Sequence, residues 1–153
     1  MTTAEKIEAI RRFPSQLEAL VTDLTSEELT TAYNASEWTV AQNVHHLVDS
    51  HMNSYIRMKF IQTQDNPTLT PYDQDVWANL PDSQSADIRA SMAIIRGLHQ
   101  RWSVFLENVD DWARPGYHPD NGPVTLESQL DYYVAHCEAH LKQIQAALDK
   151  MPK

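Results

Sequence analysis

Histidines are concentrated at two places in this sequence, and imidazole is a common ligand for transition metals in proteins. The stretch VHHLVDSH, residues 44–51, contains three of the seven histidines, and the stretch HCEAH contains His136 and His140. In an α-helix, residues four apart lie on one face, so these two imidazoles could reach the same ion. A pair at this spacing also occurs without metal, bordering a core and hydrogen-bonded to backbone or water. A metal site therefore needs a third ligand from elsewhere in the chain.

The three histidines of residues 44–51 fall on different faces of the helix expected there. His51 lies in the middle of the apolar stripe, which predicts a buried core histidine. His45 points away from that stripe, which predicts a surface or dimer-face residue. His46 begins a polar row that could form a cavity wall or an ordinary solvated face. The other members of this row are Ser50, Asn53 and Arg57.

One histidine from a middle helix and two from the last would make a three-imidazole site. Such a site suits zinc, nickel, copper or iron(II) and leaves a coordination position open for water or substrate. Cys137 lies nearer the centre of its apolar stripe, which predicts core packing rather than ligation. His99 flanks an apolar face and is expected to be structural, while His118, in a loop, could approach the mouth of the site.

Four segments with helical periodicity predict an all-α protein built as a four-helix bundle. The predicted helices are residues 3–24, 40–62, 86–108 and 126–150. Pro14 is expected to kink or divide the first helix after Arg12, because proline lacks a backbone N–H. Thr39 and Gln42 form a predicted capping box at the start of the second helix.

The connections between the helices are unequal in length. Residues 63–85 form a crossover far longer than a turn between neighbouring antiparallel helices requires. Its apolar residues predict an ordered helical turn packed on the bundle, with Tyr72 or Asp73 near the mouth of the metal cavity. These apolar residues are Tyr72, Val76, Trp77 and Leu80. A short helical turn is expected at residues 26–29, and Pro115–Gly116 and Asn121–Gly122 predict turns of a small hairpin.

Composition limits the class of protein. The 153 residues are expected to form one domain, residues 1–153, and the net charge of −9 argues against binding nucleic acid. No run approaches the roughly 18 apolar residues of a membrane span. The start of the chain lacks the apolar segment of a signal peptide, and the single cysteine suits a reducing compartment, so a cytoplasmic location is expected.

Five separated stretches resemble the DinB superfamily, specifically its YfiT-like branch, over about residues 14–148. These stretches are WTVAQNVHHLVDSHMNSYIRMKF, PYDQDVWANL, LHQRWSVFLE, YHPDNGPVTLE and YYVAHCEAHLKQI. The resemblance implies a four-helix bundle, a homodimer, and zinc or nickel held by His46, His136 and His140. Residues 137–139 and 142–143 depart from family members that carry further histidines there, which leaves the choice of substrate open.

The resemblance implies two activities on small molecules. Members of this branch are described as metal-dependent hydrolases, and the branch includes bacillithiol S-transferases, which join a low-molecular-weight thiol to an electrophile. The expected shared step is activation of water or a thiol by the metal. The residues expected to orient the substrate are Ser50, Asn53, Arg57 and Tyr72. The alternative is a non-enzymatic, dimeric bundle that binds a metal or a small ligand.

Overall fold

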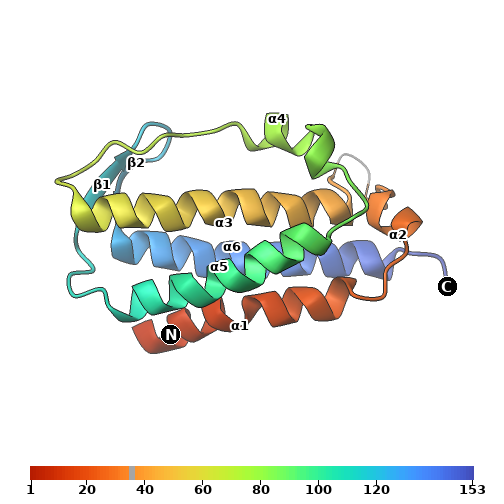
Figure 1. The fold of residues 1–153 in the computed structure, drawn as a ribbon, viewed down its shortest axis with the longest axis horizontal. Helices are drawn as coiled ribbons and strands as arrows, with labels where there is room; N and C mark the ends of the chain where they lie inside the picture. The colour runs from red at the N-terminus through yellow and green to blue at the C-terminus, as the bar shows by residue number, and fades with distance from the viewer. Residues whose placement is uncertain (35–36) are drawn as a thin grey trace.

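Four long helices lie side by side along the long axis of the molecule (Figure 1). The computed structural model describes residues 1–34 and 37–153. The long helices are α1 (Thr3–Val21), α3 (Val40–Thr63), α5 (Arg89–Glu107) and α6 (Leu126–Asp149). α1 packs against α5 and α6, and α3 packs against the same two helices. The predicted four-helix bundle is confirmed.

The long crossover exists because α3 and α5 run in the same direction. Figure 1 shows both helices running from right to left, so the chain must return along the whole length of the bundle between them. The return contains α4 (Gln74–Ala78) and the 3₁₀ turn η1 (Pro81–Ser83). The first connection contains α2 (Ser26–Thr30), where a short helical turn was expected.

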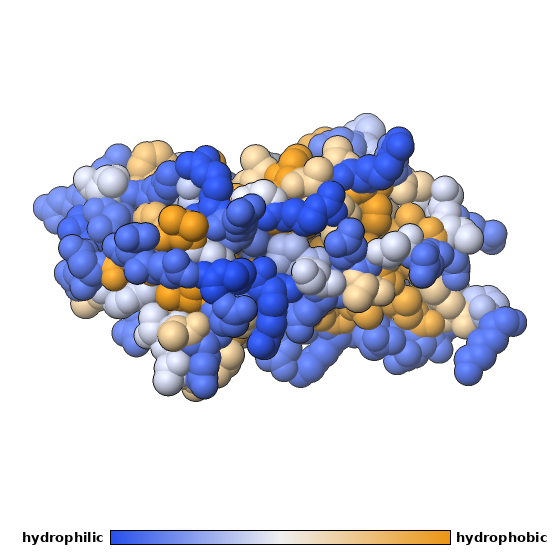
Figure 2. Space-filling view, turned by 60° about the horizontal axis from the view of Figure 1, so that its bottom comes forward, coloured by the Kyte–Doolittle hydropathy of each residue, from blue (hydrophilic) through white to orange (hydrophobic). Residues whose placement is uncertain are grey.

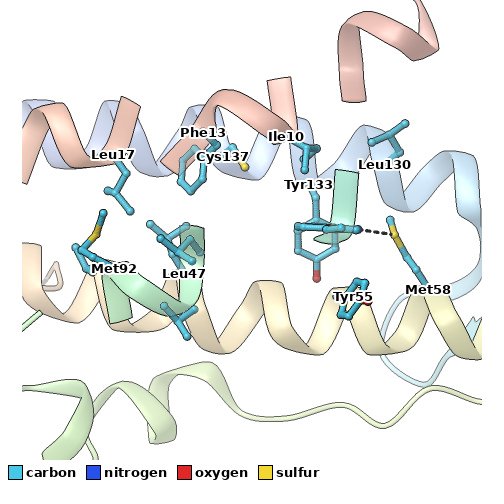
Figure 3. Close-up of a cluster of buried hydrophobic side chains, with 14 of the residues drawn as sticks. Ile10, Phe13, Leu17, Leu47, Tyr55, Met58, Met92, Leu130, Tyr133 and Cys137 are labelled. Atoms are coloured by element: carbon cyan, nitrogen blue, oxygen red, sulfur yellow. Dashed lines mark hydrogen bonds between the residues drawn. The ribbon is translucent and has the colours of Figure 1, made fainter. Parts of the chain in front are cut away.

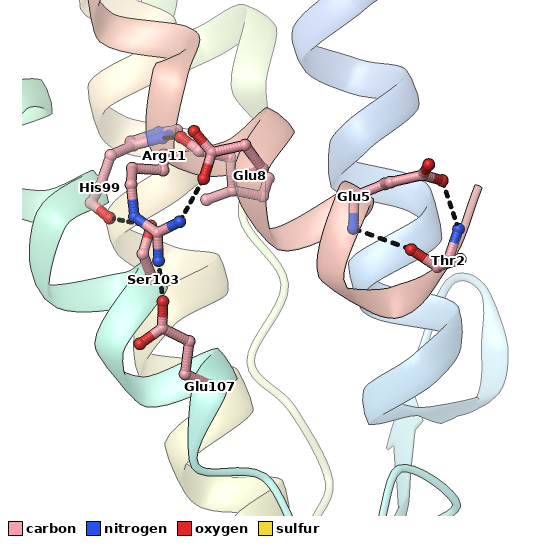
Figure 4. Close-up of polar contacts among 8 residues, drawn as sticks. Thr2, Glu5, Glu8, Arg11, His99, Ser103 and Glu107 are labelled. Carbon is pink, nitrogen blue, oxygen red and sulfur yellow. Dashed lines mark hydrogen bonds and ion pairs between the residues drawn. The ribbon is translucent and has the colours of Figure 1, made fainter.

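Capping boxes set the start of the helices that carry the site. Thr39 Oγ1 accepts a hydrogen bond from the Gln42 N–H (3.1 Å), and Gln42 Oε1 accepts one from the Thr39 N–H (3.0 Å), which confirms the predicted box. Thr125 caps α6 in the same way, and Figure 4 shows the corresponding box of Thr2 and Glu5 at α1. A good cap stabilises a helix by about 1 kcal/mol. These caps also fix which face of α3 and α6 each histidine occupies.

Pro14 does not divide the first helix. α1 is continuous from Thr3 to Val21, so a division of the helix after Arg12 is ruled out, and the extension to residue 24 is wrong. Proline leaves the carbonyl four residues earlier without its helical donor. Here that carbonyl belongs to Ile10, and it accepts a hydrogen bond from His99 Nδ1 at 2.6 Å. The lost backbone bond is replaced by one from another helix.

The crossover is ordered, but through other residues than expected. Val76, Trp77 and Leu80 remain 59%, 36% and 46% exposed. The five-residue α4 buries Ala78 instead, whose carbonyl accepts a hydrogen bond from Gln42 Nε2 on α3 at 3.0 Å. A helix this short presents one small residue to the bundle, so the larger apolar side chains are left outside.

A two-stranded hairpin closes the end of the bundle where α3 ends and α6 begins. Its antiparallel strands are β1 (Pro115–His118) and β2 (Gly122–Thr125). Gly122 has a φ of +83°, as a turn residue with no Cβ can adopt. Pro115 and Gly116 lie within β1 rather than in a turn, and a Cβ at Gly116 would lie 2.9 Å from Ile61 Cγ1. This close packing explains the glycine.

The bundle interior is a continuous apolar core (Figure 3), which also encloses several polar side chains. Cys137 is buried in it, as predicted, and burial raises the pKa of its thiol. Trp102 is fully buried, and its Nε1 donates to Met58 Sδ at 3.1 Å. The buried polar side chains include His51 and His99, both 0% exposed. The core roles predicted for these two histidines are confirmed.

The outside of the bundle is mainly polar. The face in Figure 2, which brings the lower side of Figure 1 forward, is largely hydrophilic with separate hydrophobic groups. Ile56, Phe60 and Ile94, which could take part in the expected dimer, are 50%, 45% and 45% exposed in the single chain; the homodimer stays a prediction. Among the described residues, no helix has the length and apolar character needed to span a membrane.

Candidate metal centre

His46, His136 and His140 converge in the structure. Each offers a ring nitrogen, and these three nitrogens lie within 4.8 Å of one another. His46, on α3, is buried, while His136 and His140, on α6, are partly buried. The Nε2 atoms of His46 and His136 are 3.4 Å apart. We call these three residues the histidine cluster.

The orientation of His140 is set from the first turn of α3. Asn43 Nδ2 donates to the Thr39 carbonyl at 3.1 Å, so the Asn43 amide oxygen is directed away from that carbonyl. This oxygen, Oδ1, lies 2.8 Å from His140 Nδ1. Because a carbonyl oxygen can only accept, Nδ1 carries the proton and Nε2 keeps its lone pair. Trp38 packs beside the cluster, with its ring centroid 4.6 Å from that of His46.

A chain of hydrogen bonds fixes the protonation of His136 in the same way. The Ile10 carbonyl, left free by Pro14, must accept from His99 Nδ1, so His99 Nε2 is an acceptor. His51 Nδ1, 2.7 Å away, therefore donates to it. His51 Nε2 is then the acceptor for His136 Nδ1 at 3.2 Å. The result is that His136 carries its proton on Nδ1 and keeps the Nε2 lone pair. We call this chain from Ile10 to His136 the histidine relay.

Burial keeps the cluster uncharged. It lowers the pKa of His46 and of His136 to about 3, with repulsion from neighbouring imidazoles as a further cause. Burial lowers the pKa of His140 to about 4. Metal binding requires neutral imidazole, and hydrogen bonds to the other ring nitrogen, of the kind made by Asn43 and His51, orient metal-binding histidines. The donor set thus fits a divalent transition metal such as zinc or nickel.

A polar cavity of about 300 Å³ lies beside the cluster. His136 forms part of its wall, and we call it the side cavity. It is also lined by Ser50, Arg57, Tyr72, His118, Tyr132 and Tyr133. Of the four residues expected to orient a substrate, three lie in this wall. Asn53 does not, because its side chain turns back to donate to the Asp49 carbonyl on its own helix at 2.8 Å.

Comparison with known proteins identifies the family. A sequence model described as DinB superfamily matches residues 9–144. The chain belongs to the DinB superfamily. It is 42% identical to "Putative metal-dependent hydrolase YfiT" of Bacillus subtilis (strain 168), over 90% of this chain and 79% of that protein. It is 39% identical to "Putative metal-dependent hydrolase OB0782" of Oceanobacillus iheyensis, over 92% of this chain and 82% of that protein.

A solved structure agrees with the sequence comparison. The solved structure described as "YfiT from Bacillus subtilis is a probable metal-dependent hydrolase with an unusual four-helix bundle topology" superposes with a TM-score of 0.94. It is 39% identical and covers 97% of this chain and 87% of its own. The predicted resemblance to the YfiT-like branch of the DinB superfamily is confirmed.

His45 in this DinB protein is not a surface residue, contrary to expectation. It is buried, with Nδ1 2.7 Å from Ser91 Oγ and Nε2 2.9 Å from the Ser85 carbonyl. Ser85 in the segment before α5 and Ser91 in the first turn of α5 supply the two partners. Of the two residues expected near the cavity, Tyr72 lines the side cavity, while Asp73 caps α4 through its carboxylate.

Sequence reasoning missed two tyrosines of this DinB site. Tyr132 and Tyr133 precede His136 by four and three residues, so helical spacing alone places them on the side of α6 that His136 occupies. Tyr133 is also buried. His118, which was expected in a loop that could approach the mouth of the site, is the last residue of β1 and lines the side cavity, because the hairpin folds over the start of α6.

The relay leads to a prediction about His99. Replacing His99 by phenylalanine keeps the volume of the ring but leaves His51 without its acceptor, so His136 loses its fixed tautomer. Affinity for zinc should fall about tenfold to a hundredfold, as when other hydrogen-bond partners of metal-binding histidines are removed. Competition titration with a chromogenic chelator measures this change.

His45→Phe is the matched control. It removes a buried, doubly hydrogen-bonded histidine from the same bundle, but one outside the relay. Its zinc affinity should equal that of the unmodified chain. Equal affinities for all three proteins would show that the relay does not position His136.

Proposed function

We propose that this protein is a metal-dependent enzyme that acts on small molecules, most simply as a thiol S-transferase and otherwise as a hydrolase. The observation that carries the proposal is the convergence of three neutral imidazoles, one of which, His136, lies in the wall of a polar cavity of about 300 Å³. A purely structural site would be closed, whereas this one faces a space in which a small molecule fits. The names of the relatives support a metal-dependent reaction.

His46, His136 and His140 would hold zinc or nickel. A divalent ion bound by three imidazoles lowers the pKa of the water or thiol that it binds. The chain's own contribution is positional. Asn43 and the histidine relay keep the lone pairs of His140 and His136 directed into the cluster. Trp38 packs against His46 and restricts solvent on that side.

The side cavity would hold the substrate. Burial raises the pKa of Tyr72 to about 12 and also raises the pKa of Tyr133, so both hydroxyls remain protonated and can donate hydrogen bonds. Ser50, on the same turn of α3 as His46, is buried in the cavity wall and offers a third hydroxyl. These groups can orient a polar small molecule without competing as nucleophiles at neutral pH.

Thiol transfer requires the site to lower the pKa of the nucleophile by less than hydrolysis does. A free thiol has a pKa of about 8.5, whereas bulk water has a pKa of about 15.7, so less stabilisation makes a thiolate at neutral pH. In the transfer the sulfur forms a bond to an electrophilic carbon, and the leaving group departs with the electron pair. Hydrolysis would use the same ligands with water in place of the thiol. In either case the thiol or water must lose its proton.

Activity assays test the proposal directly. Zinc- or nickel-loaded protein is expected to accelerate thioether formation between a low-molecular-weight thiol and 1-chloro-2,4-dinitrobenzene, followed by absorbance. The acceleration should disappear with a chelator and return with the metal. Metal-dependent cleavage of p-nitrophenyl acetate without thiol transfer would identify a hydrolase instead. Stoichiometric metal binding with neither activity would favour the non-enzymatic metal-binding bundle.

A further inference from the structure

The side cavity contains a buried guanidinium that makes no ion pair with the residues that the structure describes. Arg57 is only 8% exposed. Its Nη2 donates to the Thr70 carbonyl, while its Nε is buried and has no hydrogen-bond acceptor. None of the ion pairs among residues 1–34 and 37–153 involves Arg57. Its other close neighbour is the ring of Tyr72, whose centroid lies 5.7 Å from Arg57 Cζ.

The groups around Arg57 do not supply the missing negative charge. Tyr72 and Tyr133 remain neutral because burial raises the pKa of each phenol. His118 is neutral or positive at any pH, and burial lowers its pKa, with the charge of Arg57 as a further cause. Asp120 lines the cavity too, but it is exposed and makes no ion pair with Arg57. A buried, unpaired charge is costly, and arginine cannot escape this cost by losing its proton.

We propose that Arg57 is the binding residue for a carboxylate carried by the small molecule that enters the side cavity. A carboxylate oxygen is the acceptor that the guanidinium lacks, and the planar carboxylate matches the planar donor fork of arginine. One negative charge balances the single buried positive charge. A phosphate dianion would leave an excess negative charge in a cavity that already has Asp120 at its rim.

The position of Arg57 also indicates where the other end of the ligand lies. Arg57 and His136 lie in the wall of the same cavity. A molecule whose carboxylate is bound by Arg57 therefore presents a second group toward the histidine cluster, with Ser50 between them on α3. The inference rests on the proposed function only where it concerns the reaction of that second group at the metal. Binding of the carboxylate itself requires no metal.

Ligand binding to the chelator-treated, full-length chain tests the proposal, since metal-free protein excludes direct coordination of the probe. Acetate and succinate are the probes, with acetamide and succinamide as uncharged analogues and inorganic phosphate as the competing oxyanion. Fluorescence reports binding, because Trp77 packs on Tyr72 with ring centroids 4.3 Å apart. We expect saturable binding of the carboxylates, no binding of the amides, and at least a tenfold higher Kd in Arg57→Gln.

Arg101→Gln is the matched control. Arg101 also lies over a tyrosine ring, with its Cζ 5.6 Å from the centroid of Tyr55, but it is exposed and outside the side cavity. This variant loses the same charge and should keep the unmodified Kd. Arg57→Lys guards against a folding defect: it retains the charge, loses the fork, and should bind with intermediate affinity, with helicity checked by circular dichroism.

Three outcomes would overturn the carboxylate site: no saturable binding of either carboxylate, tighter binding of phosphate, or the same Kd in Arg57→Gln and Arg101→Gln. The failure of the proposed function looks different. Carboxylate binding without any metal-dependent turnover would refute the enzyme and leave the carboxylate site standing. Metal-dependent turnover by a protein that does not bind carboxylates would refute the carboxylate site and leave the enzyme standing.

Discussion

Replacing His140 by alanine is expected to abolish retention of zinc or nickel and, with it, every metal-dependent activity. Zinc binding by four-ligand sites releases about 10–16 kcal/mol, so each ligand accounts for about 3 kcal/mol or more. Loss of one ligand out of three should therefore raise the Kd of the metal by about a hundredfold to a thousandfold. His140 is only partly buried and lies at the edge of the core, so the fold should survive. Metal analysis of protein purified without a chelator or affinity-column metal measures the loss.

His118→Ala is the control for this experiment. His118 lines the same side cavity as His136 but is not part of the histidine cluster. It should keep stoichiometric metal, with at most a change in KM for a substrate that fills the cavity. Full metal content in His140→Ala, or loss of metal in His118→Ala, would contradict the assignment of His46, His136 and His140 as the ligands.

Local signals in the sequence located the four long helices and the candidate histidines, and the family resemblance supplied the choice of His46, His136 and His140 as the cluster. The Thr39 box fixed the start of α3, and the angular positions counted from it separated His46 from His51. The spacing of His136 and His140 then supplied the other two imidazoles. Each of these inferences uses residues within one helix, where periodicity and capping act over a few positions. The structure agrees with them for that reason.

Features that depend on distant segments were not predictable. His45 looked exposed because nothing in α3 shows that Ser85 and Ser91 cover it. Pro14 looked like a helix break because its compensation comes from His99, 89 residues from the Ile10 carbonyl that it bonds. The parallel course of α3 and α5 could not be read from the length of the crossover alone. In each case the deciding partner belongs to another element of the bundle.

The metal-free chain is expected to unfold in mild acid, near pH 5. Burial lowers the pKa of five histidines in the folded chain: His46, His51, His99, His136 and His140. Above pH 6.5 these groups are neutral in both the folded and the unfolded state, so stability does not depend on their titration. Below pH 6.5 the unfolded chain takes up protons first, because its imidazoles have the ordinary pKa of about 6.5. Stability is therefore lost as the pH falls from 6.5 toward 4.

The size of this loss makes the transition measurable. At pH 5 each histidine that stays neutral in the folded state and charges in the unfolded state costs about 2 kcal/mol. All five together cost up to about 10 kcal/mol, which is comparable to the usual 5–15 kcal/mol stability of a domain. Circular dichroism at 222 nm against pH should show a cooperative transition near pH 5 in the chelator-treated protein. Saturating zinc is the control, because a ligand that binds only the folded state stabilises it and moves the transition to lower pH. A metal-free chain that keeps its helicity and its near-ultraviolet signal at pH 4 would show that the buried histidines do not resist protonation as the structure indicates.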